Sequence, residues 1–242
     1  NLSGGQQQML ALAMALRTRP RLVMIDELTL GLAPVIVEQL IPVIGELRDA
    51  GTTVILVEQS VNLALTLAET AYFMEKGEIR FHGPAAELLE RPDLLRSVFL
   101  EGAGSAPPSA DARVGGSSPA GASPGAPARP AASASSSVGA GADATEPAAL
   151  PTVDLGVSFG GIRAVDGVGL TVAPGEIVGL IGPNGAGKTT VFDLISGFTP
   201  AASGRVLLGG HDLTGAGPDE RARRGLGRSF QDGRLFPALT VA

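Results

Sequence analysis

The chain has 242 residues, a formal net charge of −6 and no cysteine. This length allows one large domain or two small ones, and the lack of cysteine excludes a disulfide framework and a thiolate metal site. The negative charge argues against a general nucleic-acid-binding protein, and no apolar run approaches the roughly 18 residues that a membrane-spanning helix needs.

A short glycine-containing turn opens the chain, at Ser3, Gly4, Gly5 and Gln6. Residues 7–16 are rich in helix-forming residues, and Ser3 is a suitable N-cap for the helix that we expect there. The glycines leave the backbone bare in front of this helix, so an anion could approach its N-terminus closely. By itself such a turn is more often structural, and its meaning depends on the segment that follows.

An apolar run at residues 22–25, preceded by Arg21, is followed by Asp26 and Glu27. A continuous apolar run is typical of a strand in a parallel sheet, where both faces are buried. Two carboxylates at the end of such a strand form the Walker B pattern, in which Asp26 would hold Mg²⁺ directly or through water. Glu27 would polarise the attacking water as a general base. The alternative is a strand that simply reaches the surface at an acidic turn.

The order of these motifs resembles the C-terminal half of the ATPase domain of an ABC transporter. The run of Gly, Leu, Ala and Pro at residues 31–34 is similar to the ATP-binding subunits of bacterial branched-chain amino acid importers. The resemblance implies an α/β fold, that of a P-loop NTPase with a parallel core sheet and an antiparallel β subdomain. It also implies that Ser3, Gly4, Gly5 and Gln6 are the signature residues that contact nucleotide.

The next predicted elements are a helix at residues 34–50 and a strand at residues 53–57, after which Gln59 follows. In most ABC ATPases a histidine that contacts the γ-phosphate stands at the position of Gln59, so the resemblance gives Gln59 a catalytic role. Glutamine can form the hydrogen bond but cannot carry a positive charge. This departure, with Leu28 and Ala33 where proline and aspartate are usual, lowers the hydrolysis expected at the first domain's own site.

Residues 101–150 have a different composition, because Ala, Gly, Ser and Pro make up about four-fifths of them. Such a segment cannot bury enough apolar surface to offset its ordering entropy. We interpret it as a disordered linker with a root-mean-square reach of about 40 Å. The sequence therefore divides into residues 1–100, the linker at 101–150 and a second half-domain at 151–242.

A glycine-rich loop in the second half-domain fits the pattern G-x-x-x-x-G-K-[ST], the P-loop. An apolar strand at residues 177–181 precedes it, and a helix is predicted after it. Backbone N–H groups of such a loop surround a phosphate, the lysine reaches the β- and γ-phosphates, and the threonine hydroxyl binds Mg²⁺. A strand–helix turn without nucleotide is the alternative. The candidate nucleotide-binding residues are Gly182, Pro183, Asn184, Gly185, Ala186, Gly187, Lys188, Thr189 and Thr190.

Two further residues acquire roles by resemblance. Phe159 stands where an aromatic ring stacks on adenine in ABC ATPases, and a core phenylalanine is the alternative. Residues 227–232 resemble the Q-loop, in which Gln231 would bind Mg²⁺ or the attacking water through its side-chain oxygen and would also sense the membrane subunit. The arginines of a short helix predicted at residues 218–224 are expected to form a solvated face.

The order of the motifs is reversed, because the signature, Walker B and switch motifs precede the P-loop and Q-loop. We interpret the chain as a fragment of a fusion of two ATPase domains, with the back of the first at 1–100 and the front of the second at 151–242. Two arrangements remain open. In a head-to-tail pair of complete domains, Lys188 and Ser3 would share one nucleotide. In a circularly permuted single domain, Asp26 would lie beside Thr189. Because unpaired strands are unfavourable, the chain alone favours the second arrangement.

The resemblance implies ATP binding and hydrolysis that energise an importer, for branched-chain amino acids, with ATP and Mg²⁺ as cofactors. Its expected partners are membrane permease subunits, a second ABC ATPase domain and, indirectly, a periplasmic binding protein, with no nucleic acid. The expected location is the cytoplasmic face of the cell membrane. One alternative is a twin ABC ATPase that acts on ribosomes or DNA without transport. Another is a fragment that binds nucleotide but is inactive.

Overall fold

The computed structural model describes residues 4–29, 32–90 and 149–229. Ser3, Gln231 and nearly all of the predicted linker lie outside these residues. The first described part of the chain contains α1 (Gly4–Leu16), β1 (Leu22–Asp26), α2 (Pro34–Asp49), β2 (Thr53–Glu58), α3 (Val61–Leu67), β3 (Thr70–Glu75), β4 (Glu78–Pro84) and α4 (Ala85–Leu89). The second part contains β5 (Leu150–Phe159), β6 (Ile162–Val168), β7 (Thr171–Val172), β8 (Ile177–Ile181), α6 (Lys188–Ser196), β9 (Ser203–Leu208), β10 (His211–Asp212), α7 (Pro218–Arg223) and β11 (Leu226–Ser229).

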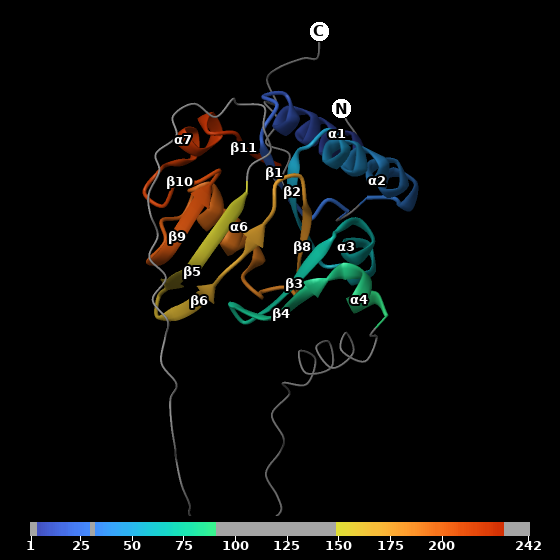
Figure 1. Cartoon of the computed structure of the whole chain (residues 1–242). Helices are drawn as coiled ribbons and strands as arrows, with labels where there is room; N and C mark the ends of the chain where they lie inside the picture. Colours follow the sequence, from blue (N-terminus) through green and yellow to red (C-terminus); the bar gives the residue numbers. More distant parts are fainter. Residues whose placement is uncertain (1–3, 30–31, 91–148, 230–242) are drawn as a thin grey trace, which may run out of the picture.

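The central sheet has six strands in the order β11-β1-β2-β8-β3-β4 (Figure 1). Neighbouring strands are parallel except for the hairpin of β3 and β4. Strand β8 of the second part pairs with β2 on one side, where Ile55 lies opposite Val178, and with β3 on the other. Strands from both sides of the predicted linker therefore lie in one sheet, with β8 inserted between β2 and β3, as the permuted arrangement predicts.

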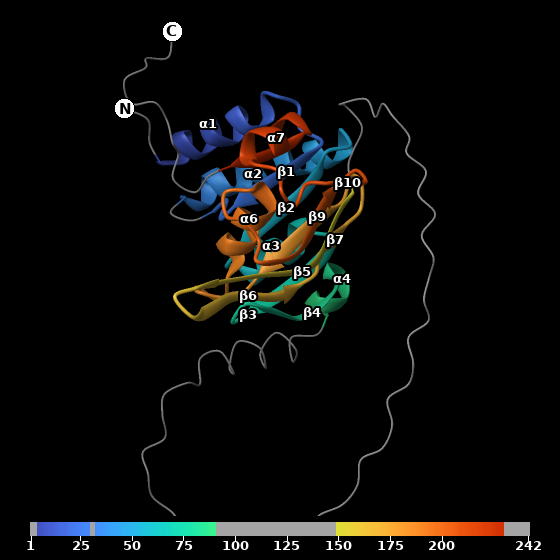
Figure 2. The ribbon, with the colours of Figure 1, turned by 90° about the vertical axis from the view of Figure 1, so that its left-hand side faces the viewer.

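The three central strands are buried on both faces, which explains their continuous apolar runs. Every residue of β1, β2 and β8 is buried, as expected for a parallel sheet covered on both sides. One face packs against α1 and α2, which lie next to each other (Figures 1 and 2), through a cluster that contains Leu12, Ile44 and Val54. The opposite face packs against α6, whose Phe192 is fully buried.

The second sheet is antiparallel, in the order β10-β9-β5-β6, with β7 also paired to β5. Its apolar residues, including Val165 and Val206, join the same core as α6 and the central sheet. Helix α6 thus has the parallel sheet on one side and the antiparallel sheet on the other. The predicted fold class is confirmed: an α/β fold with a parallel core sheet and an antiparallel β subdomain.

The prediction of a solvated arginine face on α7 is wrong for Arg221, which is 2% exposed. Its guanidinium donates hydrogen bonds to the carbonyls of Leu194 (2.7 Å) and Ile195 (2.6 Å) at the end of α6. It also donates to the carbonyls of Thr214 and Ala216. The carbonyls at a helix C-terminus have no hydrogen-bond donor within the helix. Arg221 donates to two of these carbonyls in α6.

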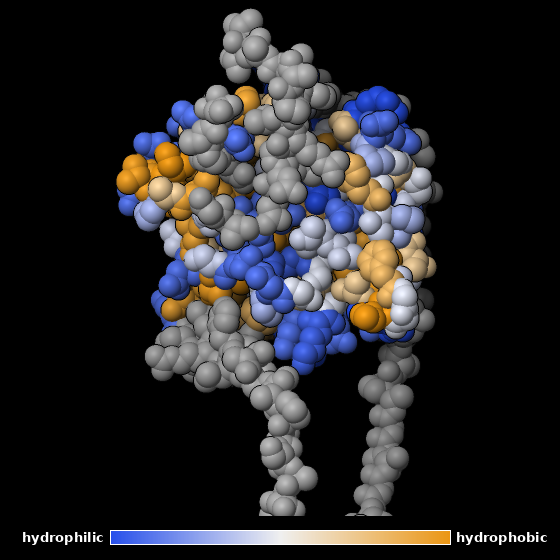
Figure 3. All heavy atoms as spheres, turned by 180° about the vertical axis from the view of Figure 1, so that it is seen from behind, coloured by the Kyte–Doolittle hydropathy of each residue, from blue (hydrophilic) through white to orange (hydrophobic). Residues whose placement is uncertain are grey.

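Hydrophilic residues separate two apolar patches at opposite edges of the face seen from behind (Figure 3). None of the helices in the described ranges is long and apolar enough to cross a membrane.

Candidate functional site

The P-loop joins the end of β8 to the start of α6, and its glycines are required by close packing. Gly187 has φ of +102°, and a Cβ atom there would lie 2.5 Å from the carbonyl oxygen of Ala164. A Cβ atom on Gly182 would lie 2.2 Å from the carbonyl oxygen of Met74. Neither contact is possible for a residue with a side chain, so the loop backbone stays bare where a phosphate could approach.

The ammonium of Lys188 lies across this loop. Lys188 is 5% exposed, and its Nζ donates hydrogen bonds to the carbonyls of Gly182 (2.7 Å) and Pro183 (2.9 Å). Burial lowers the pKa of Lys188, while the negative charges of Glu27 and Asp26 act in the opposite direction. A cation is therefore held inside the loop, close to the acidic end of β1.

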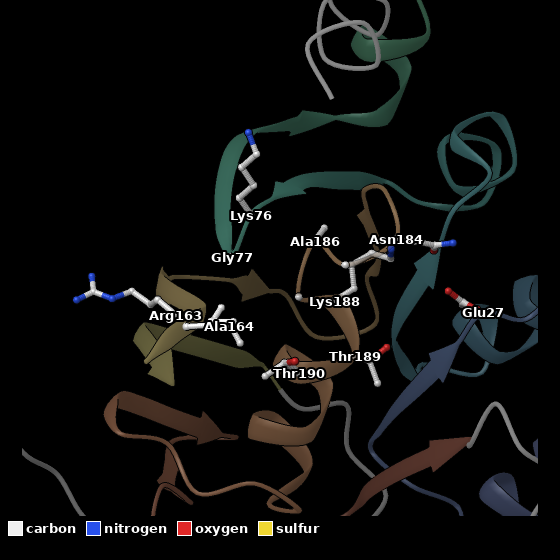
Figure 4. Close-up of a pocket in the computed structure, with 13 residues that line it drawn as sticks. Glu27, Lys76, Gly77, Arg163, Ala164, Asn184, Ala186, Lys188, Thr189 and Thr190 are labelled. Atoms are coloured by element: carbon white, nitrogen blue, oxygen red, sulfur yellow. The ribbon is translucent and has the colours of Figure 1, made fainter. Parts of the chain in front are cut away.

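A cavity of about 460 Å³ opens beside the P-loop (Figure 4). Both parts of the chain line it. Glu27, Lys76 and Gly77 come from the first part. The second part contributes Ile162, Arg163, Ala164, Asn184, Gly185, Ala186, Gly187, Lys188, Thr189 and Thr190. The β3–β4 turn is joined to the loop directly, because the N–H of Gly77 donates to the carbonyl of Ala186 at 2.9 Å.

The two Walker B carboxylates differ in their surroundings. Asp26 is 1% exposed at the end of β1, and Arg228 Nη2 lies 3.7 Å from its Oδ2 atom. Its Oδ1 atom is buried and has no hydrogen-bond partner among the described residues. Burial raises the pKa of Asp26 to about 6, against the opposing charge of Arg228. Glu27 follows with φ of +46° and lines the cavity.

Side-chain hydrogen bonds join the end of β2 to the residues after β1. The Nε2 atom of Gln59 donates to Oε1 of Glu27 at 2.7 Å. The backbone N–H and the hydroxyl of Thr29 donate to the carboxylate of the buried Glu58, at 3.1–3.3 Å. Gln59 was predicted to contact a γ-phosphate, and the structure places its amide on the candidate general base.

The remaining predicted residues are less closely associated with the cavity. Gly182 and Pro183 accept the hydrogen bonds of Lys188 and do not line it. Phe159 is 52% exposed, so it is not a core residue, and the cavity is lined instead by Ile162, which lies opposite it across the β5–β6 hairpin. Gly4 and Gly5 begin α1, and Gln6 is exposed on its first turn.

The oxygen atoms at this site fit Mg²⁺, which binds through one or two carboxylates together with substrate phosphates. The partnerless Oδ1 atom of Asp26 is a suitable hard donor, and the exposed Thr189 supplies a hydroxyl at the start of α6. Within the described ranges, no group of three or more His, Asp or Glu residues could hold a metal ion. The phosphates of a nucleotide would therefore have to supply further ligands.

Sequence reasoning missed three residues around this site. Arg228 lies in the run that resembles the Q-loop, but no role of its own was predicted for it. Glu58, which directly precedes Gln59, was not predicted as a site residue either. The signal for Glu58 was present, because it is a carboxylate at the end of an otherwise apolar strand. Gly77 contributes through the packing of a hairpin turn against the P-loop, and no local pattern reveals such a contact.

Comparison with known proteins gives matches to parts of this chain. Residues 165–242 match the family model described as ABC transporter. The chain is 48% identical over 101 residues to the high-affinity branched-chain amino acid transport ATP-binding protein BraG of Pseudomonas aeruginosa, covering 42% of this chain and 43% of BraG. It is 51% identical over 83 residues to LivG of Escherichia coli, a protein of the same description, covering 34% and 32%.

A relative with a different description matches over a similar length. The lipopolysaccharide export system ATP-binding protein LptB of Escherichia coli is 43% identical over 94 residues, covering 39% of each chain. The chain thus spans less than half the length of each of these relatives. A solved nucleotide-free ATP-binding cassette from an ABC transporter is 39% identical, with a TM-score of 0.34, covering 35% of this chain and 33% of that one.

Proposed function

We propose that this chain, whose residues 165–242 match the family model described as ABC transporter, is part of an ATPase that binds ATP with Mg²⁺ and hydrolyses it to drive transport. One observation carries the proposal. Lys188 of the P-loop and Glu27 of the Walker B strand line the same cavity, although they lie on opposite sides of the predicted linker. The residue types that ATP hydrolysis requires are therefore assembled at one edge of one sheet.

The P-loop would bind the phosphates. Its bare backbone and the N-terminus of α6 favour negative charge, and Lys188 would exchange its carbonyl partners Gly182 and Pro183 for phosphate oxygens. The half-exposed ring of Phe159 has the open surface that stacking on adenine needs.

Asp26, Thr189 and Gln231 would hold Mg²⁺, with the phosphates completing its ligands. The ion would neutralise charge on the transferring phosphoryl group. The observation that supports this assignment is the buried Oδ1 atom of Asp26, which is left without a hydrogen bond.

Glu27 would accept the proton of the attacking water. Gln59 holds one oxygen of its carboxylate through the 2.7 Å hydrogen bond. Lys188 would also accelerate hydrolysis by stabilising the negative charge on the phosphate groups.

The proposed parent protein is a fusion of two ATPase domains. Residues 1–100 would be the back of the first, 101–150 the linker and 151–242 the front of the second. In that protein the domains would pair head to tail, so that the signature residues 3–6 face the nucleotide of the partner domain, and the Walker B partner of Lys188 would come from the rest of its own domain. Glu27 and Lys188 share one cavity in the arrangement that the present chain adopts. Membrane permease subunits, and indirectly a periplasmic binding protein, would complete an importer on the cytoplasmic face of the membrane.

Branched-chain amino acids are the proposed substrate class. The run at residues 31–34 and the similarity to BraG and LivG support this assignment. The similarity to LptB, which is named for lipopolysaccharide export, covers 39% of the chain, compared with 42% for BraG and 34% for LivG. The assignment of the substrate class therefore depends on the run at residues 31–34 and on the similarity to BraG and LivG, since no residue of an ATPase site contacts the transported molecule.

The test measures ATP affinity and phosphate release for the wild type, Glu27→Gln and the control Glu38→Gln, whose carboxylate is exposed on α2. Loss of the general base should lower phosphate release by about 10²–10⁴-fold and leave ATP affinity within about threefold. The control should match the wild type. Binding without phosphate release in the wild type would identify an inactive nucleotide-binding piece, and the lack of saturable binding would contradict the proposal.

A further inference from the structure

A buried arginine connects the end of β1 to the helix that follows the P-loop. Arg228 lies on β11, and its side chain is 7% exposed. Its Nη1 atom donates hydrogen bonds to Oδ1 of Asp193 (2.6 Å) and to Oγ of Ser196 (2.7 Å), both on α6. Its Nη2 atom lies 3.7 Å from Oδ2 of Asp26. One guanidinium group therefore bridges two carboxylates on different elements.

Aromatic rings fix the position of this guanidinium. The Cζ atom of Arg228 lies 5.8 Å from the ring centre of Phe192 and 5.6 Å from that of Phe198. Both distances are within the range of cation–π attraction. Phe192 is fully buried, and protein interiors are close-packed, so the arginine is held by packing as well as by charge.

The two oxygen atoms of the Asp26 carboxylate have different surroundings as a result. Oδ2 lies on the side of Arg228, whereas Oδ1 is buried without a hydrogen-bond partner among the described residues. A buried carboxylate oxygen without a partner is unfavourable, and it marks the atom that a bound cation would satisfy.

We propose that Arg228 is a positioning residue for Asp26. It holds the carboxylate in one orientation through Oδ2, leaves Oδ1 for Mg²⁺, and is itself anchored to α6 by Asp193 and Ser196. This inference rests on the proposed function and deepens it. The side chain of Arg228 connects three parts of the site: strand β11, which leads toward Gln231, the Walker B carboxylate Asp26, and helix α6 after the P-loop.

Arginine suits this position better than lysine. Its planar guanidinium carries several donors in a fixed fork, so it can bond to α6 and approach Asp26 at the same time. A lysine would supply the charge from a single nitrogen, which could not keep both carboxylates in these positions.

The experiment uses the full chain and a fluorescent ATP analogue, with its affinity measured once in Mg²⁺ and once in EDTA. Arg228→Gln is compared with Arg228→Lys and with the control Arg224→Gln, which removes an equal charge from a half-exposed side chain. The ratio of the two affinities reports the metal contribution. Arg228→Gln should lower this ratio by about tenfold, with the affinity in EDTA within about twofold of the wild type. Arg228→Lys should give an intermediate loss, and the control none.

Equal losses of affinity in Mg²⁺ and in EDTA would show a purely structural role and would overturn the inference. An unchanged ratio in both Arg228 variants would also overturn it, while leaving the proposed function intact. If Arg228→Gln does not fold, judged by its circular dichroism spectrum, the ratio for Arg228→Lys decides. A wild type that binds no nucleotide in either condition would contradict the proposed function and remove the inference with it.

Discussion

Gln59 donates a hydrogen bond to Glu27 at a distance of 2.7 Å between Nε2 and Oε1. The two residues follow different strands, β2 and β1. The bond fixes one oxygen of the Glu27 carboxylate, and the backbone of Glu27 is in the left-handed conformation. A neutral amide can hold this carboxylate without adding charge. The position predicted to sense a γ-phosphate therefore also orients the candidate general base.

Replacement of Gln59 by alanine should lower phosphate release about tenfold, because a misplaced catalytic group loses much of its effect. ATP affinity should stay within about threefold, since the amide donates its hydrogen bond to Glu27. Steady-state phosphate release and ATP binding measure the two quantities. Gln39→Ala, on the exposed face of α2, is the matched control. A change in affinity as large as the change in rate would assign Gln59 to nucleotide binding instead.

Replacement of Arg221 by methionine should lower the free energy of unfolding by roughly 2–5 kcal/mol, because it leaves several buried carbonyls without donors. The affected acceptors include the carbonyls of Leu194 and Ile195 at the end of α6. Arg223→Met, on the exposed side of the same helix, should change stability by about 0.5 kcal/mol or less. Urea unfolding followed by circular dichroism measures both, and equal effects would contradict this role of Arg221.

Replacement of Glu58 by glutamine should stabilise the protein relative to the wild type as the pH rises. Burial raises the pKa of Glu58 above its ordinary value of 4.5, although the hydrogen bonds from Thr29 oppose this shift. The protonated form of Glu58 stabilises the folded state. This contribution is fully present below pH 4.5 and is lost as the pH rises through the pKa that Glu58 has in the folded protein. Glutamine keeps an acceptor for Thr29 without the charge.

Unfolding measured from pH 4.5 to pH 8 tests this dependence. The difference in unfolding free energy between Glu58→Gln and the wild type should grow in favour of the variant over this range. A difference that stays constant with pH would show that Glu58 does not titrate with a raised pKa. Glu38→Gln serves as the exposed carboxylate control on α2.

The sequence was most informative where one local pattern determines one structure. The apolar runs predicted the buried strands β1, β2 and β8, because a strand covered on both faces has to be apolar throughout. The spacing of glycines before Lys188 predicted the bare loop between β8 and α6. Both predictions depend only on neighbouring residues, and both are confirmed.

Pairing across the chain was harder to predict. The sequence left two arrangements open, because nothing local to β8 indicates that β2 and β3 flank it. Arg221 and Arg228 show the same limit. A charged residue in a short element is usually solvated, and only the three-dimensional structure reveals the carbonyls and carboxylates that two distant segments place around these side chains.

The central claim is that one nucleotide site is built from both parts of the chain. The most direct test is the Mg-ATP affinity of the full chain, measured for the wild type, Lys188→Ala and Asp26→Asn. We expect each substitution to weaken binding by at least about tenfold. If Lys188→Ala weakens binding and Asp26→Asn leaves it unchanged, the Walker B strand does not serve this P-loop and the claim is contradicted.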